Sequence, residues 1–295
     1  MSMPLLKLAV VGCNTAAGLL ETLSELKLPL AAFYPLDRDD EGELVSFGGE
    51  DWPVMALGDF NWASADVAIF LSQTEAIADA LAAGCKVVDA SNGEPQRGAV
   101  QVPNVIDVLL ARLVGAFKAG GELTTVTATG LLAVSQEGQP GIDKLSEQTR
   151  AIFAQQAVEV GTTYAKRIAF NLVPQEQQAV TARAAKLSRK LGVPLSLQLA
   201  HVPVFYGHSL SVAVQFAQPV TAAALQAAFT QTAGIYLLER GVASPQDAIG
   251  GEQVWVSQLA VAEDGLSASA WAVVDNSKLS ALLTLAALQA ALEAR

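Results

Sequence analysis

Residues 5–18 read LLKLAVVGCNTAAG and determine how the fold begins. Residues 5–11 form an apolar run with a single lysine, which is typical of a strand buried on both faces of a parallel sheet. The run stops at Gly12, and leucines then recur at helical spacing over residues 15–26. A strand, a glycine turn and a helix in this order predict the first half of a right-handed βαβ unit.

The same alternation continues through the first part of the chain. Apolar runs predict strands at 28–34, 65–71 and 86–89, and amphipathic spacing predicts helices at 75–83 and 106–119. We therefore expect a doubly wound, mostly parallel sheet with helices on both faces.

The second part of the chain has longer, alternating β-prone runs. We expect strands at 123–134, 195–204, 209–216, 254–261 and 267–274, and helices at 141–156, 174–191 and 221–231. Short turns predict that the second of these strands pairs with the third, and the fourth with the fifth. A sheet covered by helices on one side would leave its other face to a second subunit.

These patterns divide the chain into two domains. The first is expected over residues 1–122 together with 276–295, because the leucine-rich last helix would pack back on the first sheet. The second is expected over residues 123–275. A length of 295 residues with 52% hydrophobic residues suits two cores of ordinary size. The predicted class is α/β, with a Rossmann-like doubly wound N-terminal domain and an α+β domain built on a large mixed sheet.

Charge and cysteine content narrow the function classes. The chain carries 18 Lys and Arg against 29 Asp and Glu, a net charge of −11, so binding to nucleic acid or to an anionic membrane surface is not expected. Cys13 and Cys85 lack the spacing of a disulfide framework or a zinc site, and no metal is expected. No signal-peptide pattern is present, and the apolar stretch at 279–292 is shorter than a membrane span of about 20 residues. We expect a cytoplasmic protein.

The turn after the first strand is a candidate nucleotide site. Gly12 and Gly18 suit the approach of backbone N–H groups to a pyrophosphate at a helix N-terminus. Thr15 holds the middle position, where its Cβ narrows the approach, although Asn14 and Thr15 can cap the helix. Arg38 would suit a 2′-phosphate, but acidic residues surround it. Two interpretations stay open, a weak NADP site and a purely structural strand–helix turn.

His201 and His208 are the only histidines of the chain, and they flank the connection between two predicted strands. If those strands pair, both rings would face one pocket near the turn. An acid–base role at neutral pH is one interpretation of His208, and a structural histidine is the other. A metal site would need a third ligand that this stretch does not supply.

Seven short motifs add up to a known pattern. They are VVG at 10–12, VVDAS at 87–91, PN at 103–104, SQEGQPGIDKL at 135–145, AFNLVP at 169–174, VPV with GH at 202–208, and DN at 275–276. With these motifs in this order and spacing, the chain resembles the aspartate-semialdehyde dehydrogenase family along nearly its whole length. It is most similar to the Usg-type bacterial paralogues, which carry this fold with altered active sites.

The resemblance implies a fold, a cofactor and an assembly. It implies a Rossmann-like N-terminal domain, a dimerisation domain of the glyceraldehyde-3-phosphate-dehydrogenase C-terminal type, and a homodimer. Family members pass a hydride to NADP. By the resemblance, cofactor contacts would come from Gly12, Asn14, Thr15, Gly18, Ser91 and Asn276.

The resemblance also implies chemistry that these residues do not match. In the family a cysteine attacks the aldehyde, a histidine acts as acid–base, and an arginine holds the substrate carboxylate. Here Val105 stands where the cysteine follows a Pro-Asn pair, and His201 stands where an arginine begins the Arg-Val-Pro-Val motif. Leu132 stands where the family has a glutamine near the thiol. His208 retains the acid–base position.

Three functions therefore stay open. The first is a non-catalytic paralogue that acts as a homodimer by binding a small ligand or a partner. The second is an enzyme of different chemistry that uses His208 and His201. The third is an active NADP-dependent dehydrogenase of amino-acid biosynthesis with a displaced nucleophile. Cys85 precedes its strand, at the sheet edge away from ligands, and Cys13 lies against the pyrophosphate position, so neither suits that role.

Overall fold

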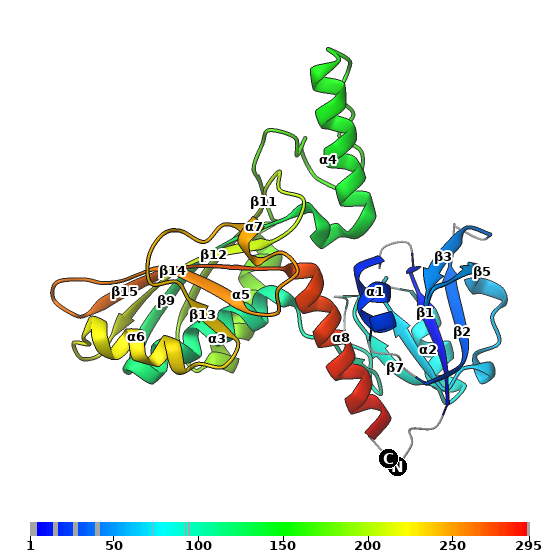
Figure 1. Cartoon of the computed structure of the whole chain (residues 1–295), viewed down its shortest axis with the longest axis horizontal. Helices are drawn as coiled ribbons and strands as arrows, with labels where there is room; N and C mark the ends of the chain where they lie inside the picture. The colour runs from blue at the N-terminus through cyan, green and yellow to red at the C-terminus, as the bar shows by residue number, and fades with distance from the viewer. Residues whose placement is uncertain are drawn as a thin grey trace. The chain divides into compact units, whose positions relative to one another are not determined.

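The computed structural model describes residues 5–13, 17–25, 29–38, 42–72, 74–91, 93 and 95–293. The chain divides into two compact units, one formed by Met1–Asn104 with Ser280–Arg295 and the other by Val105–Leu279. Each unit is built on one large sheet, as Figure 1 shows. The predicted class, a doubly wound parallel sheet followed by a mixed sheet, is confirmed. None of the described helices is long and apolar enough to cross a membrane.

The large sheet of the first unit is parallel throughout, in the order β5-β2-β1-β6-β7-β8. Its strands are β1 (Leu6–Val11), β2 (Leu30–Asp37), β5 (Met55–Ala56), β6 (Val67–Phe70), β7 (Lys86–Asp89) and β8 (Val100–Gln101). The chain moves outward from β1 to β2 and then returns to the other side of β1 at β6. The order therefore reverses between β1 and β6, and open α/β sheets bind ligands at the carboxyl end of such a reversal.

Strand β1 is buried on both faces because its side chains alternate between two cores. Leu8 and Val10 lie in a core with helix α1 (Ala17–Glu25) and the last helix α8 (Asn276–Glu293). Ala9 and Val11 lie in the other core, where α2 (Ala76–Ala82) packs. The lysine of the run, Lys7, is exposed at the start of the strand. This burial on both sides explains the continuous apolar pattern of residues 5–11.

A hairpin that the sequence did not predict lies between β2 and β5. It consists of β3 (Leu44–Phe47) and β4 (Glu50–Pro53), followed by the short 3₁₀ helices η2 (Leu57–Asp59) and η3 (Trp62–Ser64). Phe47 stacks on Phe33 of β2 with ring centroids 4.2 Å apart. The hairpin therefore contributes side chains to the same core as α1.

The sheet of the second unit is mixed, in the order β10-β11-β9-β12-β15-β14-β13. Its strands are β9 (Leu123–Leu132), β10 (Val173–Pro174), β11 (Leu195–His201), β12 (His208–Phe216), β13 (Ile235–Leu237), β14 (Val254–Val261) and β15 (Ser267–Val274). The pairs β11–β9 and β13–β14 are parallel, and the other neighbours are antiparallel. The predicted hairpin of the last two strands is confirmed as β14 and β15.

The other predicted hairpin was wrong, because β11 and β12 do not pair with each other. Strand β9 lies between them, parallel to β11 and antiparallel to β12. The connection over residues 202–207 crosses the end of β9, where the carbonyls of Val204 and Phe205 accept hydrogen bonds from the backbone of Val134 and Ser135. A short connection can join two strands that lie on either side of a third when it passes over the end of that third strand.

Helix α3 (Val105–Gly120) belongs to the second unit rather than to the first, so the division falls after Asn104 and not after residue 122. Phe117 of α3 packs edge-to-face on Phe229 of α6 (Ala222–Gln231), with ring centroids 4.8 Å apart. Asp107 of α3 also pairs with Arg183 of α5 (Gln177–Leu191) at 2.6 Å. The amphipathic pattern predicted the helix but could not tell which sheet its apolar face would cover.

The two faces of the second sheet differ in polarity. Along β9, Val126 and Ala128 are buried on the helix side, whereas Thr127 between them is exposed. On β12 and β15 the exposed positions of the same kind include Ala213 and Ser269. Helices α3, α5 and α6 lie on one side of this sheet (Figure 1). The opposite face of these strands carries both small side chains and the partly exposed Trp271.

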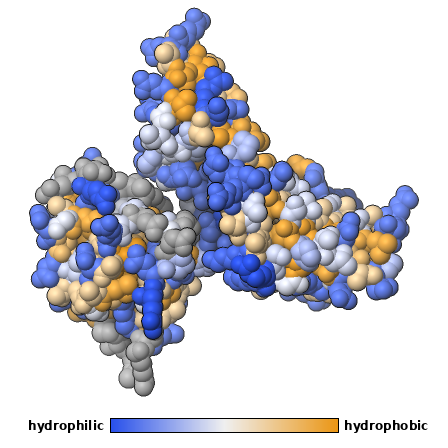
Figure 2. All heavy atoms as spheres, turned by 180° about the vertical axis from the view of Figure 1, so that it is seen from behind, coloured by the Kyte–Doolittle hydropathy of each residue, from blue (hydrophilic) through white to orange (hydrophobic). Residues whose placement is uncertain are grey.

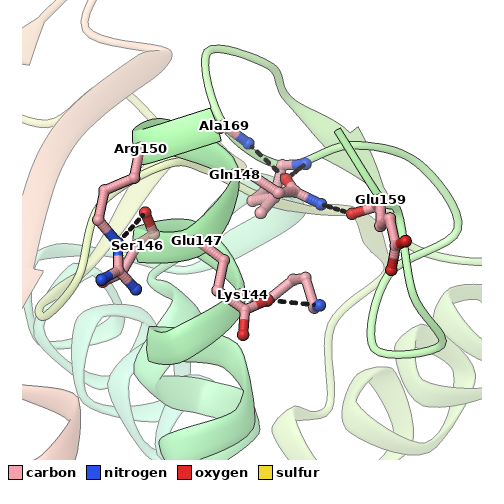
Figure 3. A network of polar contacts seen from close by, with 8 residues as sticks. Lys144, Ser146, Glu147, Gln148, Arg150, Glu159 and Ala169 are labelled. Carbon is pink, nitrogen blue, oxygen red and sulfur yellow. Dashed lines mark hydrogen bonds and ion pairs between the residues drawn. The ribbon is translucent and has the colours of Figure 1, made fainter. Parts of the chain in front are cut away.

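An arm projects from the end of β9 and consists of α4 (Gly138–Phe153) and the segment 154–172 (Figure 1). Gln148 of α4 ties the two parts together, as Figure 3 shows. Its Oε1 atom accepts hydrogen bonds from the backbone N–H groups of Ile168 and Ala169, and its Nε2 atom donates to the Glu159 carbonyl at 3.0 Å. Because Gln148 is buried, these bonds fix how the segment returns toward the sheet.

Apolar side chains also gather on the outer surface of the arm (Figure 2). Phe153 and Phe170 lie edge-to-face with centroids 5.8 Å apart, and they are 76% and 61% exposed. Leu172 nearby in the sequence is half exposed. Exposed aromatic side chains of this size are more common at protein contacts than on a free surface.

Candidate functional site

The two histidines meet at the end of β9, although their strands do not pair. His201 ends β11 opposite Leu132 of β9, and His208 begins β12, next to the Ser209–Leu131 pair. The sheet therefore places one histidine on each side of Leu132, about 5 Å away on each neighbouring strand. Leu132 is fully buried between them. The chain then turns into the 3₁₀ helix η4 (Val134–Glu137), which carries polar side chains toward both rings.

His208 is fully buried and both of its ring nitrogens have partners. Its Nδ1 atom accepts a hydrogen bond from the Ala133 backbone N–H at 3.1 Å, so its Nε2 atom carries the proton that bonds to Gln136 Oε1 at 2.8 Å. Burial lowers the pKa of His208 to about 3, with smaller contributions from His201 and Arg183. The ring is a neutral structural element in this arrangement. An acid–base role would require Gln136 to leave Nε2.

Asn276 also forms bonds within the chain. This buried side chain lies at the start of α8, where its Oδ1 atom accepts from the Gly207 N–H at 2.9 Å. Its Nδ2 atom donates to the hydroxyl of Ser135 at 2.9 Å. Asn276 thus joins the turn before His208 to the start of η4. The cofactor contact expected at Asn276 stays a prediction.

His201 lies in a more open environment than His208. Its Nε2 atom is 3.3 Å from Gln175 Nε2 and 3.8 Å from Glu137 Oε1. The Tyr164 ring lies edge-on to it, with centroids 5.2 Å apart. Burial lowers the pKa of His201. Its Nδ1 atom is buried and has no hydrogen-bond partner among the described residues.

Glu137 lies next to His201, with its Oε1 atom 3.8 Å from the Nε2 atom of the ring. It ends η4 and precedes the first residue of α4. Its side chain is 37% exposed, and burial of the remainder raises its pKa. The sequence-based argument did not single out Gln136, Glu137, Gln175 or Tyr164. The signal that could have found the first two is a Gln-Glu pair directly after a long β-prone run.

Val105, which the resemblance predicts to replace the family's nucleophile, lies at the start of a helix. It is the first residue of α3 and is buried, with 8% exposure. The N-terminus of a helix stabilises a negative charge such as a thiolate. An isopropyl group at that position has no ionisable atom. The helix terminus is therefore suited to a nucleophile that this side chain cannot provide.

The glycine turn after β1 is the second candidate site. Gly12 has φ of 85°, a left-handed conformation that favours glycine, and a Cβ there would lie 3.1 Å from Ser72 Oγ. Asn14 and Thr15 lie outside the described residues, and for Gly18 only the helical backbone of α1 is described. The contacts expected at these positions stay predictions.

A cavity of about 450 Å³ lies at the carboxyl end of β2 in the same unit. Its lining includes Arg38, Phe60, Trp62 and Thr74. One guanidinium nitrogen of Arg38 donates to Thr74 Oγ1 at 3.4 Å. A cation beside aromatic side chains at a strand end could hold a ring system and a phosphate.

Ser91 forms hydrogen bonds within the turn that follows β7. Its hydroxyl donates to Asp89 Oδ1 and accepts from the Gly93 N–H at 3.3 Å. Asp89 is fully buried, and Gln101 donates to its other oxygen. The bonds of Ser91 thus satisfy a buried carboxylate. The cofactor contact expected at Ser91 stays a prediction.

Neither cysteine is poised to act as a nucleophile. Cys13 is buried and donates to the Val10 carbonyl, and burial raises its pKa to about 12. Cys85 donates to the carbonyls of Trp62 and Ala65, and burial raises its pKa as well. In the described part of the chain, no group of three His, Cys, Asp or Glu side chains gathers to hold a metal ion.

The family model for the semialdehyde dehydrogenase dimerisation domain matches residues 113–277, a span that includes both histidines and the whole arm. The chain belongs to the semialdehyde dehydrogenase family. The resemblance inferred from the seven motifs is confirmed.

Two relatives match over nearly the full length. The aspartate-semialdehyde dehydrogenase of Rickettsia bellii is 25% identical and covers 94% of each chain. The USG-1 protein homolog of Pseudomonas aeruginosa is 28% identical and covers 96% of each. Both names, an enzyme and a Usg-type protein, agree with the resemblance.

Solved structures show the same fold along the whole chain. A probable aspartate-semialdehyde dehydrogenase from Pseudomonas aeruginosa superimposes with a TM-score of 0.85 at 24% identity, covering 99% of each chain. Aspartate semialdehyde dehydrogenase II from Vibrio cholerae, complexed with ASA, gives 0.83 at 22% identity over 99% of each. At these identities the structures establish the architecture, and activity has to be argued from the residues of this chain.

Proposed function

We propose that this chain is a non-catalytic member of the semialdehyde dehydrogenase family, which acts as a homodimer by binding a small ligand. The observation that carries the proposal is Val105 at the N-terminus of α3. The family's reaction needs a sulfur that attacks the aldehyde and then carries the acyl group. Valine can do neither.

Two further observations support a loss of chemistry. His201 takes the place of a substrate-binding arginine, and it faces Glu137 with its pKa lowered by burial. It therefore lacks the permanent charge and the two-pronged donor geometry of a guanidinium. His208 is buried with both ring nitrogens bonded inside the chain. The same bonds weigh against an enzyme of different chemistry that uses His208.

A displaced cysteine is also a poor route to an active dehydrogenase. Only a thiolate attacks an aldehyde efficiently. The pKa of Cys13 is raised to about 12, and that of Cys85 is raised too. Both thiols would be protonated at neutral pH. This favours the non-catalytic function over the third alternative.

NADP binding is part of the proposal because residues of the first unit suit the phosphate groups of NADP. Gly12 follows β1 and has no side chain, and Arg38 lines the cavity at the carboxyl end of β2 with a positive charge. These residues would hold the pyrophosphate and the 2′-phosphate. When bound, NADP supplies a hydride acceptor. In this chain its binding would stabilise the first unit without leading to turnover.

The homodimer is supported by the family match and by the second sheet. The matched domain is a dimerisation domain. The face of the sheet that carries Thr127, Ala213 and Ser269 is exposed at these positions in a single chain. A second copy would cover it. Sedimentation equilibrium should give the mass of two subunits, and a mass near 30.7 kDa would contradict the dimer.

The decisive test is an activity measurement. The purified chain, mixed with aspartate semialdehyde, phosphate and NADP, should show no formation of NADPH, whereas an active relative assayed in parallel should. Turnover that persists through repeated purification and follows this protein in the column fractions would overturn the proposal.

A single substitution sharpens that test. Val105→Cys restores a sulfur at the helix terminus but leaves His201 in place of the arginine, so we expect it to stay inactive. The missing charge–charge contact corresponds to roughly 2–4 kcal/mol of binding. Measurable NADPH formation by Val105→Cys would show that His201 can hold the substrate. Faster reaction of the Val105→Cys protein than of the parent chain with a thiol reagent would confirm that the new sulfur is accessible.

A further inference from the structure

The corner formed by Glu137, His201 and Tyr164 carries a charge pattern opposite to that of the family site. A guanidinium would place a fixed positive charge where His201 lies, whereas here the carboxylate of Glu137 lies 3.8 Å from the His201 Nε2 atom. We propose that this corner binds the ammonium group of a small organic cation, with Glu137 as its counter-ion. The proposal rests on the ligand-binding function proposed above.

Glu137 is a carboxylate without a neighbouring Lys or Arg in the described part of the chain. Among the described residues, its one ion-pair contact is with His201, and that contact is longer than a hydrogen bond. The side chain is 37% exposed, so a ligand can reach it, and the remainder is shielded from water. A partly buried carboxylate without a partner is costly, and a bound ammonium would offset that cost.

His201 cannot supply the missing charge. Its side chain is only 10% exposed, and burial lowers its pKa, so the ring is neutral near pH 7. Its Nδ1 atom is buried without a partner in the described part of the chain, although most buried polar atoms have one. Because the Nδ1 atom is buried, the hydrogen-bonding capacity that a ligand can reach in this corner is that of the Glu137 carboxylate.

Tyr164 is the aromatic neighbour of His201, and it is buried, with 4% exposure. Its ring lies 5.2 Å from the His201 ring, and its hydroxyl reaches the Val134 carbonyl at 3.5 Å. Burial, with a smaller contribution from the charge of Glu137, raises the pKa of Tyr164. The phenol is therefore neutral and does not compete with a bound ammonium group for the Glu137 carboxylate.

An anionic ligand does not fit the same corner. A carboxylate would meet Glu137 in place of a guanidinium, and like charges this close repel each other. Arg183 is near enough to His208 to affect its pKa, but Asp107 holds it at 2.6 Å. The charges on this part of the unit therefore favour a cation over the carboxylate that the family binds.

The test uses three probes of equal length on the full chain, namely n-butylammonium, n-butyrate and n-butanol, titrated by ligand-observed NMR. We expect n-butylammonium to bind at least tenfold more tightly than either of the others. Glu137→Gln keeps the size of the side chain and removes its charge, so it should abolish that preference. Glu147→Gln, a carboxylate of α4 paired with Lys144 at 2.7 Å, is the matched control and should keep it.

A second readout does not depend on a variant. The chain has only two histidines, so their ring signals can be followed separately. Butylammonium should shift the His201 signals and leave those of the fully buried His208 unchanged. Equal binding of butyrate, no binding of butylammonium, or an unchanged preference in Glu137→Gln would each overturn the cation site. The activity assay tests the proposed function separately. A chain that shows no turnover and no preference for butylammonium would be a non-catalytic family member without the cation site. Turnover would reject the non-catalytic function itself.

Discussion

The turn after β1 and the end of β9 both retain residues of the family's motifs, but they use them differently. At the turn, Gly12 has a left-handed conformation and no side chain, and its N–H donates to the Leu36 carbonyl at 2.9 Å. At the end of β9, the polar groups of His208 and Asn276 are bonded to the chain itself.

This difference shows that polar residues of a motif can be used for hydrogen bonds within the chain itself. A glycine acts through the absence of a side chain, so the same property accounts for its conformation and for its function. A histidine or an asparagine can be kept because a buried backbone N–H needs its acceptor. At the end of β9, stability accounts for the retained residues, whereas the corner of Glu137 and His201 has unsatisfied groups in the described part of the chain.

The largest expected effect comes from filling the space beneath η4. Gly141→Ala places a Cβ 2.2 Å from the Val134 carbonyl oxygen, a backbone atom that cannot move aside freely. We expect a loss of roughly 3 kcal/mol or more in the free energy of unfolding, measured by urea denaturation. Gly115→Ala is the matched control in α3, where a Cβ meets nothing within 4 Å, and it should be neutral or stabilising by up to about 1 kcal/mol. Equal changes in the free energy of unfolding of the two variants would show that the Val134 carbonyl can move to make room for the added Cβ.

Removing the His208 ring should be the next largest change. His208→Leu leaves the Ala133 N–H without its acceptor and Gln136 without its donor, both in a buried environment. We expect a loss of about 2–4 kcal/mol in the same denaturation experiment. A structural role predicts this loss whether or not a ligand is present. A variant as stable as the parent chain would show that the ring is held for another purpose.

The pH dependence of stability isolates the same residue. His208 stays neutral in the folded chain down to about pH 3, whereas in the unfolded chain it takes up a proton below its ordinary pKa of about 6.5. Above about pH 6.5 the protonation of His208 therefore does not change the free energy of unfolding. As the pH falls from about 6.5 toward 3, its contribution lowers that free energy by about 1 kcal/mol per pH unit. His208→Leu should remove this slope. His201 and Glu137 are present in both proteins, so their contributions cancel in the comparison, and parallel pH profiles would contradict the assignment.

The smallest effect on stability is expected at the turn after β1. Gly12→Ala imposes a left-handed conformation on alanine and brings its Cβ 3.1 Å from Ser72 Oγ, so we expect a loss of about 1–2 kcal/mol. If the turn also binds NADP, the thermal shift that NADP produces should disappear in this variant. Arg38→Ala should weaken the shift for NADP more than for NAD. An identical shift for both dinucleotides in both variants would place their binding elsewhere.

Much of the fold could be predicted because its signals are local. The apolar run of β1, the helical spacing of α3 and the alternation of β14 and β15 each depend on neighbours along the chain. The pairing of β11 with β12 was predicted wrongly because the short connection between them resembles a hairpin. The hairpin of β3 and β4 was missed, since acidic residues surround it and its core side chains are few.

The sequence alone determined the class of the fold and the family, because these depend on which residues stand in which order, and it predicted that Val105 replaces the family's nucleophile. It could not determine what His208 does. Whether a histidine is a base or a structural acceptor depends on the atoms around it, and those come from β9, η4 and α8. Only the tertiary structure brings Glu137 next to His201, since Glu137 follows β9 and His201 ends β11, and these two strands are parallel neighbours. Charge, burial and hydrogen bonding at a site are properties of neighbours in space, and for that reason only the structure shows which contacts these residues make.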